Sequence, residues 1–166
     1  MQLRYSGERY LSEAPGKSIH YEHLHRYAFA KYFAKGKKVI DIACGEGYGS
    51  YLLAEMAEDV TALDIDEATI AHAAHKYKKG NLKFLQGSMT ELPFKTKECF
   101  DLAVCMEGIE HTKQQSKVFD QISKVLKKEG ILIISTPNIT AYKKHDGNKN
   151  PFHEKELSRI ELEDLL

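Results

Sequence analysis

Closely spaced glycines mark the part of the sequence best suited to holding a ligand. The stretch Asp-Ile-Ala-Cys-Gly-Glu-Gly-Tyr-Gly, residues 41–49, leaves an apolar run and enters a segment with helical periodicity. Glycine lets the backbone turn tightly and approach a ligand without interference from a Cβ atom. We therefore expect a ligand-binding turn between a strand and a helix, with Gly45 and Gly47 at its centre. The alternative is a tight turn without a ligand.

The spacing of these glycines bears on the kind of ligand. The loop reads G-x-G-x-G, whereas the dinucleotide fingerprint reads G-x-G-x-x-G and holds a pyrophosphate at a helix N-terminus. Ser50 stands where the third glycine of that fingerprint would be, and Glu46 adds a carboxylate to the loop. A carboxylate repels phosphates and suits a positively charged or zwitterionic ligand. The sequence therefore disfavours an NAD-linked oxidoreductase.

A second acidic position follows the apolar run 60–63. Asp64 stands 19 residues after Gly45. In a doubly wound sheet, a carboxylate there accepts charge-assisted hydrogen bonds from the ribose hydroxyls of a nucleoside. Asp66 competes for this role, but aspartate is also common at the N-cap of a helix. We assign Asp64 to the ribose and Asp66 to the cap.

The segment Met-Glu-Gly-Ile-Glu-His, residues 106–111, contains the candidates for acid–base chemistry. Histidine titrates near neutral pH, and a base beside a reacting hydroxyl accelerates its reaction by about 10²–10⁴-fold. We assign His111 as the candidate base and Glu110 as the residue that orients it or contacts the substrate. The alternative is that both residues only begin the next helix.

Strands and helices must position these residues. From Lys37 onward, the sequence alternates between the hydrophobic patterns typical of strands and of helices. Short apolar runs predict strands, and apolar residues at i, i+3, i+4 and i+7 predict helices. Strands separated by helices imply βαβ units and a parallel sheet that is covered on both faces. The expected strands are residues 39–43, 60–63, 82–85, 100–105 and 131–135, and the expected helices are residues 48–57, 67–77 and 113–128.

A single domain over residues 1–166 is expected, in three parts. These parts are an N-terminal helical leader or lid at 1–36, a ligand-binding core at 37–138, and a loop with an incomplete helix at 139–166. In the leader, a helix at 22–33 is expected to turn four residues toward the core: Leu24, Tyr27, Ala28 and Tyr32. The last helix is expected to begin near His153 or Leu157.

The composition is that of an ordinary globular chain. Hydrophobic residues make up 42% of the 166 residues, and 24 basic residues balance 24 acidic ones. A chain without net charge has no overall field that attracts nucleic acid, so no nucleic-acid partner is expected. No apolar run approaches the ~20 residues that span a bilayer. Three cysteines without C-x-x-C spacing fit reduced thiols, and we expect a cytoplasmic protein.

Five segments, in order, resemble the motifs of class I S-adenosylmethionine-dependent methyltransferases. The segments are residues 39–47, 63–66, 86–94, 100–105 and 129–138. This resemblance covers about residues 37–138. It implies a Rossmann-like, doubly wound, mostly parallel α/β sheet in the order 3-2-1-4-5, with S-adenosylmethionine as cofactor and S-adenosylhomocysteine as product. The family sheet usually has seven strands, so we expect a C-terminally truncated sheet of about five.

The resemblance also implies a role for each motif residue. The region of Asp41, Ala43, Gly45 and Gly47 would hold the methionine moiety, and Asp64 the ribose. The residues near adenine would be Ile65, Ser88 and Met89, where Ser88 replaces the usual aspartate. Cys105 would line the pocket near the sulfonium, or else is a small buried residue.

Resemblances outside the core suggest an acceptor. The E-x-x-E-H segment, residues 107–111, resembles one in ubiquinone-pathway O-methyltransferases and small-RNA 2′-O-methyltransferases, where such a segment and a later histidine hold a divalent metal. Here that histidine would be His153, or in second place His145, although we assign no metal. Residues 6–27 and 150–157 resemble methyltransferases of surface-polysaccharide synthesis. This implies a small-molecule or glycan acceptor methylated at oxygen.

Two further expectations concern the cover of the site and its partners. Four aromatic or polar residues are candidates for a lid, with ordinary packing as the alternative: Tyr5, Tyr10, His23 and His25. An uncovered edge of the fifth strand would favour a homodimer. The alternative to an enzyme is a non-catalytic S-adenosylmethionine-binding domain that a partner completes.

Overall fold

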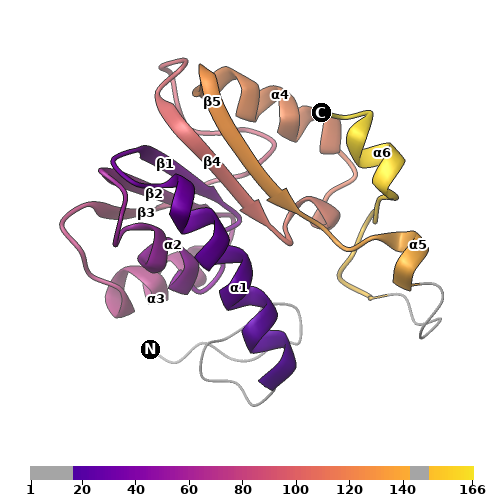
Figure 1. Ribbon diagram of the computed structural model, residues 1–166, viewed down its shortest axis with the longest axis horizontal. Coiled ribbons are helices and arrows are strands. Elements are labelled where there is room, and N and C mark those ends of the chain that lie inside the picture. The colour runs from indigo at the N-terminus through magenta and orange to yellow at the C-terminus, as the bar shows by residue number, and fades with distance from the viewer. Residues whose placement is uncertain (1–16, 143–149) are drawn as a thin grey trace.

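Five strands form one parallel sheet in the order β3-β2-β1-β4-β5 (Figure 1). The computed structural model describes residues 17–142 and 150–166. The strands are β1 (Lys38–Ile42), β2 (Asp59–Asp64), β3 (Leu82–Gln86), β4 (Phe100–Met106) and β5 (Leu126–Ser135). The helices are α1 (Lys17–Phe33), α2 (Tyr48–Leu53), α3 (Glu67–Lys76), α4 (Gln115–Val125), α5 (Ile139–Tyr142) and α6 (Arg159–Glu163), with a 3₁₀ turn at Ile109–His111. The predicted fold class and strand order are confirmed.

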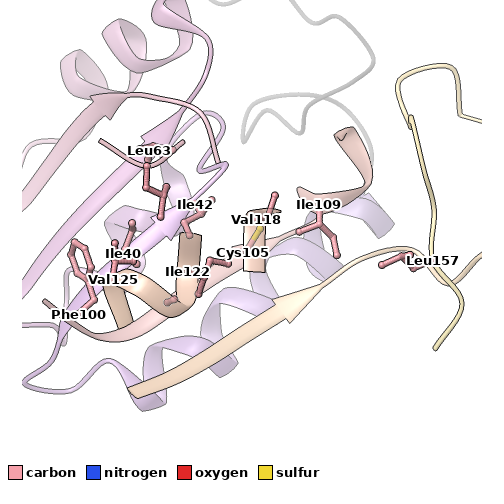
Figure 2. Close-up of a cluster of buried hydrophobic side chains, with 12 residues drawn as sticks. Ile40, Ile42, Leu63, Phe100, Cys105, Ile109, Val118, Ile122, Val125 and Leu157 are labelled. Atoms are coloured by element: carbon pink, nitrogen blue, oxygen red, sulfur yellow. The ribbon is translucent and has the colours of Figure 1, made fainter. Parts of the chain in front are cut away.

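Helices cover both faces of the sheet, as apolar central strands require. On one face, Val39, Val60 and Leu102 pack against α1 and α2. On the other face, side chains of β1 and β4 pack against α4, which contributes Val118, Ile122 and Val125 (Figure 2). Successive side chains of a strand point to opposite faces. Asp41, between Ile40 and Ile42, therefore points toward α1 and α2.

Helix α1 presents a different face to the core from the one predicted. Tyr27, Ala30 and, directly after the helix, Ala34 are buried, whereas Ala28 is exposed and Tyr32 is 89% exposed. The prediction that Ala28 and Tyr32 face the core is therefore wrong, whereas those for Tyr27 and the partly buried Leu24 are correct. Small residues at i+3 and i+7 from Tyr27 let the helix lie close to the sheet, and hydrophobicity alone did not reveal this.

Gly49 provides the space that the ring of Tyr27 occupies. A Cβ atom at Gly49 would lie 2.2 Å from Cζ of that ring. We expect Gly49→Ala to lower the free energy of unfolding by about 1–3 kcal/mol, because overpacking a core forces its elements apart. Urea denaturation measures this loss. Gly80→Ala, where nothing lies within 4 Å, is the matched control, and an equal loss in both variants would contradict the prediction.

Two helices end three or more residues earlier than their periodicity predicted. Helix α2 ends at Leu53 rather than at residue 57, and Met56 is exposed. Helix α4 ends at Val125 rather than at residue 128, because Leu126 already pairs with Phe100 of β4 before a register shift. At the end of α4, strand pairing thus competes with helix formation, and the sheet sets the boundary.

The C-terminal strap, which we define as residues 150–158, lies against the end of β4. The backbone N–H groups of Glu154 and Lys155 both donate to the carbonyl oxygen of Glu110, at 2.9 and 3.2 Å. Leu157 is buried in the core on the α4 side. Helix α6 begins at Arg159, after a capping box of Ser158 and Glu161. Of the two predicted starts, the one near His153 is wrong, and the one near Leu157 lies two residues before the observed start. Among the described helices, none is long and apolar enough to cross a bilayer.

Candidate functional site

The glycine loop turns sharply at the carboxyl end of β1. Three of its residues have left-handed backbone conformations: Ala43 at φ 58°, Gly45 at φ 54° and Gly47 at φ 92°. A Cβ atom at Gly47 would lie 2.8 Å from the Phe84 ring, whereas one at Gly45 would meet nothing within 4 Å. Gly47 therefore allows Phe84 of β3 and Ala73 of α3 to pack closely against the loop, and Gly45 borders open space.

Ala43 adopts a conformation that alanine disfavours. The left-handed region costs an L-residue about 1–2 kcal/mol, and glycine in exchange loses about 0.5–1 kcal/mol more conformational entropy on folding. We expect Ala43→Gly to raise the free energy of unfolding by about 0.5–1 kcal/mol. Ala54→Gly, at φ −65°, should lower it by about 0.5–1 kcal/mol. Chemical denaturation of both variants checks the sign, and a loss of stability in Ala43→Gly would contradict the argument.

Asp64 stands at the tip of β2 and already organises the loop. Its Oδ2 accepts a hydrogen bond from the N–H of Gly45 at 2.9 Å, and its Oδ1 accepts one from the N–H of Asp66 at 3.0 Å. A carboxylate offers about four lone-pair positions, so two remain for further donors. Ile65, the next residue, is 68% exposed although apolar. The ribose and adenine roles of these two residues remain predictions, and this geometry suits them.

Asp66 caps α3, as predicted. Its side chain accepts a hydrogen bond from the N–H of Ala68 at 3.3 Å and one from the hydroxyl of Thr69. The two neighbouring aspartates thus point to different partners. This result could be expected from sequence because an N-cap bond is local: it joins residues two and three positions apart.

Glu46 does not face the ligand space, which corrects our interpretation of the loop. Its carboxylate is 2% exposed and turns toward the C-terminal part of α3. Lys76 donates to it at 2.6 Å and the hydroxyl of Tyr77 at 3.0 Å, and His72 lies 3.7 Å away. The carboxylate anchors the glycine loop to α3. Its partners lie about thirty positions away in sequence, so no local pattern indicated them.

Asp41 is fully buried below the loop. The hydroxyl of Tyr27 donates to its Oδ1 at 3.1 Å, and the hydroxyl of Ser50 donates to its Oδ2 at 2.6 Å. Burial, the largest cause, raises the pKa of Asp41 to about 7, although both hydrogen bonds favour the charged form. The carboxyl group joins β1 to α1 and α2. A direct contact between Asp41 and the methionine moiety remains a prediction.

Three other predicted residues lie farther along the carboxyl edge. The hydroxyl of Ser88 forms a turn with Thr90, accepting from its N–H at 3.2 Å, and Met89 packs against the core. Cys105 is fully buried in that core, and burial raises the pKa of its thiol. This placement agrees with the alternative that Cys105 is only a small buried residue. A role of Cys105 in lining the pocket remains a prediction.

Glu110 lies at the carboxyl end of β4 with 1% of its surface exposed. The hydroxyl of Thr136 donates to its Oε2 at 3.0 Å. Its Oε1 has no hydrogen-bond partner within the part of the chain that the structure describes. Burial, the largest cause, raises the pKa of Glu110 to about 7. A buried carboxyl oxygen without a partner is costly, so this atom is suited to meeting a ligand.

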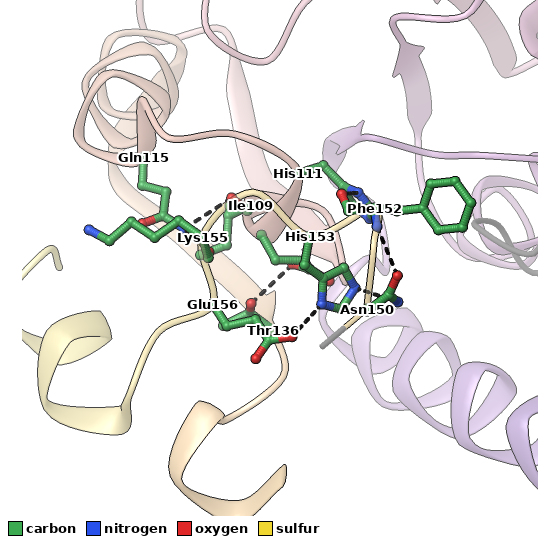
Figure 3. A network of polar contacts seen from close by, with 10 residues as sticks. Ile109, His111, Gln115, Thr136, Asn150, Phe152, His153, Lys155 and Glu156 are labelled. Atoms are coloured by element: carbon green, nitrogen blue, oxygen red, sulfur yellow. Dashed lines mark hydrogen bonds and ion pairs between the residues drawn. The ribbon is translucent and has the colours of Figure 1, made fainter. Parts of the chain in front are cut away.

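The C-terminal strap brings a second histidine beside His111. The rings of His111 and His153 meet edge to face, with centroids 5.3 Å apart (Figure 3). Nδ1 of His111 lies 3.0 Å from the carbonyl oxygen of Phe152, and Nδ1 of His153 lies 2.7 Å from the carboxylate of Glu156. Because both partners accept, each Nδ1 donates a hydrogen bond and carries a proton. Nε2 of His153 then accepts from the Asn150 amide at 3.0 Å.

These side chains fit a divalent cation by the chemistry of their donor atoms. One ligand atom each from Glu110, His111 and His153 lies within 4.8 Å of the others. Histidines that bind metals commonly donate their other N–H to a carboxylate or a carbonyl, as both do here. Glu107 does not belong to this group of possible ligands, and its Oε1 accepts a hydrogen bond from the hydroxyl of Ser135 at 2.7 Å. His145 lies outside the described residues.

The predicted lid is described only in part. His23 lies on α1 with its ring edge toward Tyr48, at 6.5 Å between centroids. Burial, followed by the nearby charge of Arg26, lowers the pKa of His23. His25 is exposed on the same helix, and Tyr5 and Tyr10 lie outside the described residues.

Solved structures share this fold. A Pyrococcus horikoshii protein superimposes with a TM-score of 0.75 at 24% identity, over 89% of this chain and 81% of that one. The YcgJ protein of Bacillus subtilis gives a TM-score of 0.73 at 20% identity, over 86% of this chain and 66% of that one. At these identities the likeness concerns the fold alone.

Sequence relatives add the family. A family model described as "Methyltransferase domain" matches residues 33–162. The chain is 39% identical over 132 residues to a "Probable S-adenosylmethionine-dependent methyltransferase" of Mycolicibacterium smegmatis, over 79% of this chain and 50% of the relative. It is 32% identical over 112 residues to the "Ubiquinone biosynthesis O-methyltransferase" of Glaesserella parasuis, over 64% of this chain and 48% of the relative. The chain spans about half the length of these relatives. Its motifs, strand order and family match agree, and the chain belongs to the class I, S-adenosylmethionine-dependent methyltransferase domain family.

Proposed function

We propose that the chain binds S-adenosylmethionine at the carboxyl edge of the sheet and serves the transfer of its methyl group to a hydroxyl of a small-molecule or sugar acceptor. The observation that carries this proposal is the juxtaposition of Gly45 and Asp64. Open space lies beside Gly45, Asp64 keeps lone pairs for two ribose hydroxyls, and the exposed Ile65 offers an apolar surface to adenine. The cofactor supplies an activated methyl group, because the neutral thioether that its sulfonium becomes is a good leaving group.

On the acceptor side, we assign Glu110 and His111 to the reacting hydroxyl. The carbonyl of Phe152 holds the proton on Nδ1 of His111, so Nε2 is the atom that would take the hydroxyl proton. The buried Oε1 of Glu110 would accept a hydrogen bond from the same substrate. The experiment is transfer of a labelled methyl group by wild type and His111→Ala. A matched control is His75→Ala, which removes an exposed histidine of α3.

As an alternative, we propose that the same side chains bind a divalent cation. The buried Oε1 of Glu110, which has no hydrogen-bond partner among the described residues, favours this alternative. Glu110, His111 and His153 would hold it, with His153 giving up its bond to Asn150. A cation there would polarise an acceptor hydroxyl and lower its pKa. Titration of the metal-free chain with Co²⁺ tests this assignment by visible absorption. Bands that appear with wild type and His75→Ala but not with His153→Ala support it, and bands that survive in His153→Ala count against it.

The class of acceptor follows from resemblance, and a panel of candidates tests it. Calorimetry with S-adenosylhomocysteine and with NAD first separates a methyltransferase from an oxidoreductase. Labelled methyl transfer to sugars, quinols and RNAs then separates acceptors. Transfer to a sugar supports the proposal, whereas transfer to RNA alone would replace the proposed acceptor class. Tight cofactor binding without any transfer favours a non-catalytic binding domain.

A homodimer remains a proposal as well. Strand β5 pairs only with β4 in the described sheet, and Ile131 on β5 is partly exposed. An edge strand with apolar side chains favours pairing with another chain. We expect light scattering over a tenfold concentration range to show a mass that rises toward twice 18.9 kDa. A constant monomer mass would overturn this expectation.

A further inference from the structure

A buried amide at the start of α4 joins two separate segments of the chain. Gln115 is 2% exposed, and its Nε2 donates to the carbonyl oxygen of Ile109 at 3.1 Å and to that of Lys155 at 2.8 Å (Figure 3). A glutamine amide carries two N–H donors, so both are engaged. Because both partners are carbonyl oxygens, they also fix which end of the amide faces them.

The other end of the same amide indicates that Gln115 does more than fill space. Its Oε1 is buried and has no hydrogen-bond partner among the described residues. A buried acceptor without a partner is costly, and an unbranched apolar side chain such as methionine would fill a similar volume without that cost. The two N–H donors are therefore the property of this side chain that the surrounding structure uses.

The two carbonyl groups belong to the two segments that carry the candidate histidines. Ile109 begins the 3₁₀ turn that contains His111. Lys155 lies in the C-terminal strap, two residues after His153. Gln115 therefore links these segments directly, from a helix that carries neither histidine. The 5.3 Å between the two ring centroids depends on how the turn and the strap are set against each other.

Gln115 completes the attachment of the strap at Lys155. The backbone N–H of Lys155 donates to the carbonyl oxygen of Glu110 at 3.2 Å, and the carbonyl oxygen of Lys155 accepts from Gln115. Both backbone polar groups of this residue are thus held, which fixes the rotation of the strap as well as its position. The same strap presents the carbonyl oxygen of Phe152 to Nδ1 of His111 at 3.0 Å. A strap that rotated would take this acceptor away from the His111 ring.

We propose that Gln115 is a positioning residue for the acceptor side of the site: it fixes the strap on the turn after β4 and thereby sets the tautomer and the orientation of the His111 ring. This role rests on the proposed function, because it takes His111 to face the acceptor hydroxyl. Gln115 itself touches neither the acceptor nor the cofactor. A misplacement of about 1 Å caused by a distant change costs about 10²-fold in rate, so a residue without contact to the substrate has a large effect on turnover.

Nitrogen-15 NMR of the histidine rings tests the positioning without any acceptor. At about pH 8.5, above the range in which histidines usually titrate, we expect His111 of wild type to be the Nδ1–H tautomer and to show a nuclear Overhauser effect to the ring of His153. Gln115→Met keeps the length of the side chain and loses both donors. We expect it to return His111 to the Nε2–H tautomer that free histidine prefers and to abolish the Overhauser effect. Gln115→Glu, which has the same shape but no N–H donors, should give the same result.

Gln121→Met is the matched control on the same helix. The Oε1 of Gln121 accepts a hydrogen bond from the N–H of Leu92 at 3.2 Å, so this variant removes an amide that holds a different segment. It should keep the wild-type tautomer of His111 and the Overhauser effect. Thermal midpoints report whether each variant folds. The inference is overturned if the folded Gln115 variants keep both wild-type signals, or if Gln121→Met loses them as well.

A double-mutant cycle separates positioning from a merely structural role. In labelled methyl transfer to the sugar panel, we expect Gln115→Met to lower kcat at least about tenfold and to leave the calorimetric affinity for S-adenosylhomocysteine unchanged. Because Gln115 acts through His111, adding Gln115→Met to His111→Ala should lower kcat no further. An equal further loss in the His111→Ala background would overturn this role. If wild type transfers no methyl group to the panel, the proposed function fails, while the NMR signals still decide whether Gln115 positions His111.

Discussion

Asp64→Ala is expected to weaken binding of S-adenosylhomocysteine by at least about 100-fold, because hydrogen bonds to a charged group contribute about 1.5–3 kcal/mol each. Two hydroxyls of the ribose would lose their shared acceptor. In addition, the N–H groups of Gly45 and Asp66 would lose the carboxylate that they now share. Isothermal calorimetry of wild type and variant measures the change directly.

Asp66→Ala is the matched control for this prediction. It removes a carboxylate two positions away that caps α3, and loss of a cap costs about 0.5–2 kcal/mol of stability. We therefore expect Asp66→Ala to lower the free energy of unfolding while its cofactor affinity stays near that of wild type. If Asp66→Ala weakens cofactor binding as much as Asp64→Ala does, the two assignments are reversed.

The second large effect concerns pH and the buried carboxyl group of Asp41. We expect the stability of Asp41→Asn, relative to wild type, to rise by about 4 kcal/mol between pH 4 and pH 8, because each unit of pKa shift corresponds to about 1.4 kcal/mol. The pKa rises from 3.8 to about 7 on folding, chiefly through burial. Asparagine has the same shape and does not ionise.

The sign follows from proton linkage. Between pH 3.8 and about 7, the folded protein keeps the Asp41 proton and the unfolded chain has lost it. The stability contributed by the raised pKa is therefore complete below pH 3.8 and is lost as the pH rises through about 7. Glu110, whose pKa also rises to about 7, contributes with the same sign in both proteins. Comparing variant with wild type at each pH removes its contribution.

Asp101→Asn provides a control of opposite sign. A hydrogen bond from Lys127, followed by one from the N–H of Lys38, lowers the pKa of Asp101. The ionised carboxylate of Asp101 therefore stabilises the folded protein at pH values above 3.8, the pKa of Asp101 in the unfolded chain. Asp101→Asn should thus become less stable relative to wild type as the pH rises toward that value. Denaturant unfolding at pH 4, 6 and 8 measures the difference for Asp41→Asn, and the difference for Asp101→Asn is measured as the pH falls below 3.8, where the stabilisation by Asp101 is lost. A flat difference for Asp41→Asn would show that this carboxyl titrates normally in the fold.

Features that depend on a few adjacent residues could be predicted from the sequence. The glycine loop, the tip position of Asp64 and the cap formed by Asp66 each follow from spacing within a strand–turn–helix unit. The turn and the cap are local because the hydrogen bonds and backbone conformations that define them join residues only a few positions apart. The order of the strands is not local, since Val39 of β1 pairs with Leu102 of β4, and it was implied by the resemblance of five motifs to a known family.

Features that depend on packing between distant elements were decided by the tertiary structure. The buried carboxylate of Glu46 finds Lys76 thirty positions away. The core face of α1 is set by the fit of Tyr27 against Gly49, and the strap places His153 beside His111. Periodicity reports how apolar a face is, but it does not report which other element meets that face. Close packing selects the partner, because only one arrangement fills the space and satisfies the buried polar atoms.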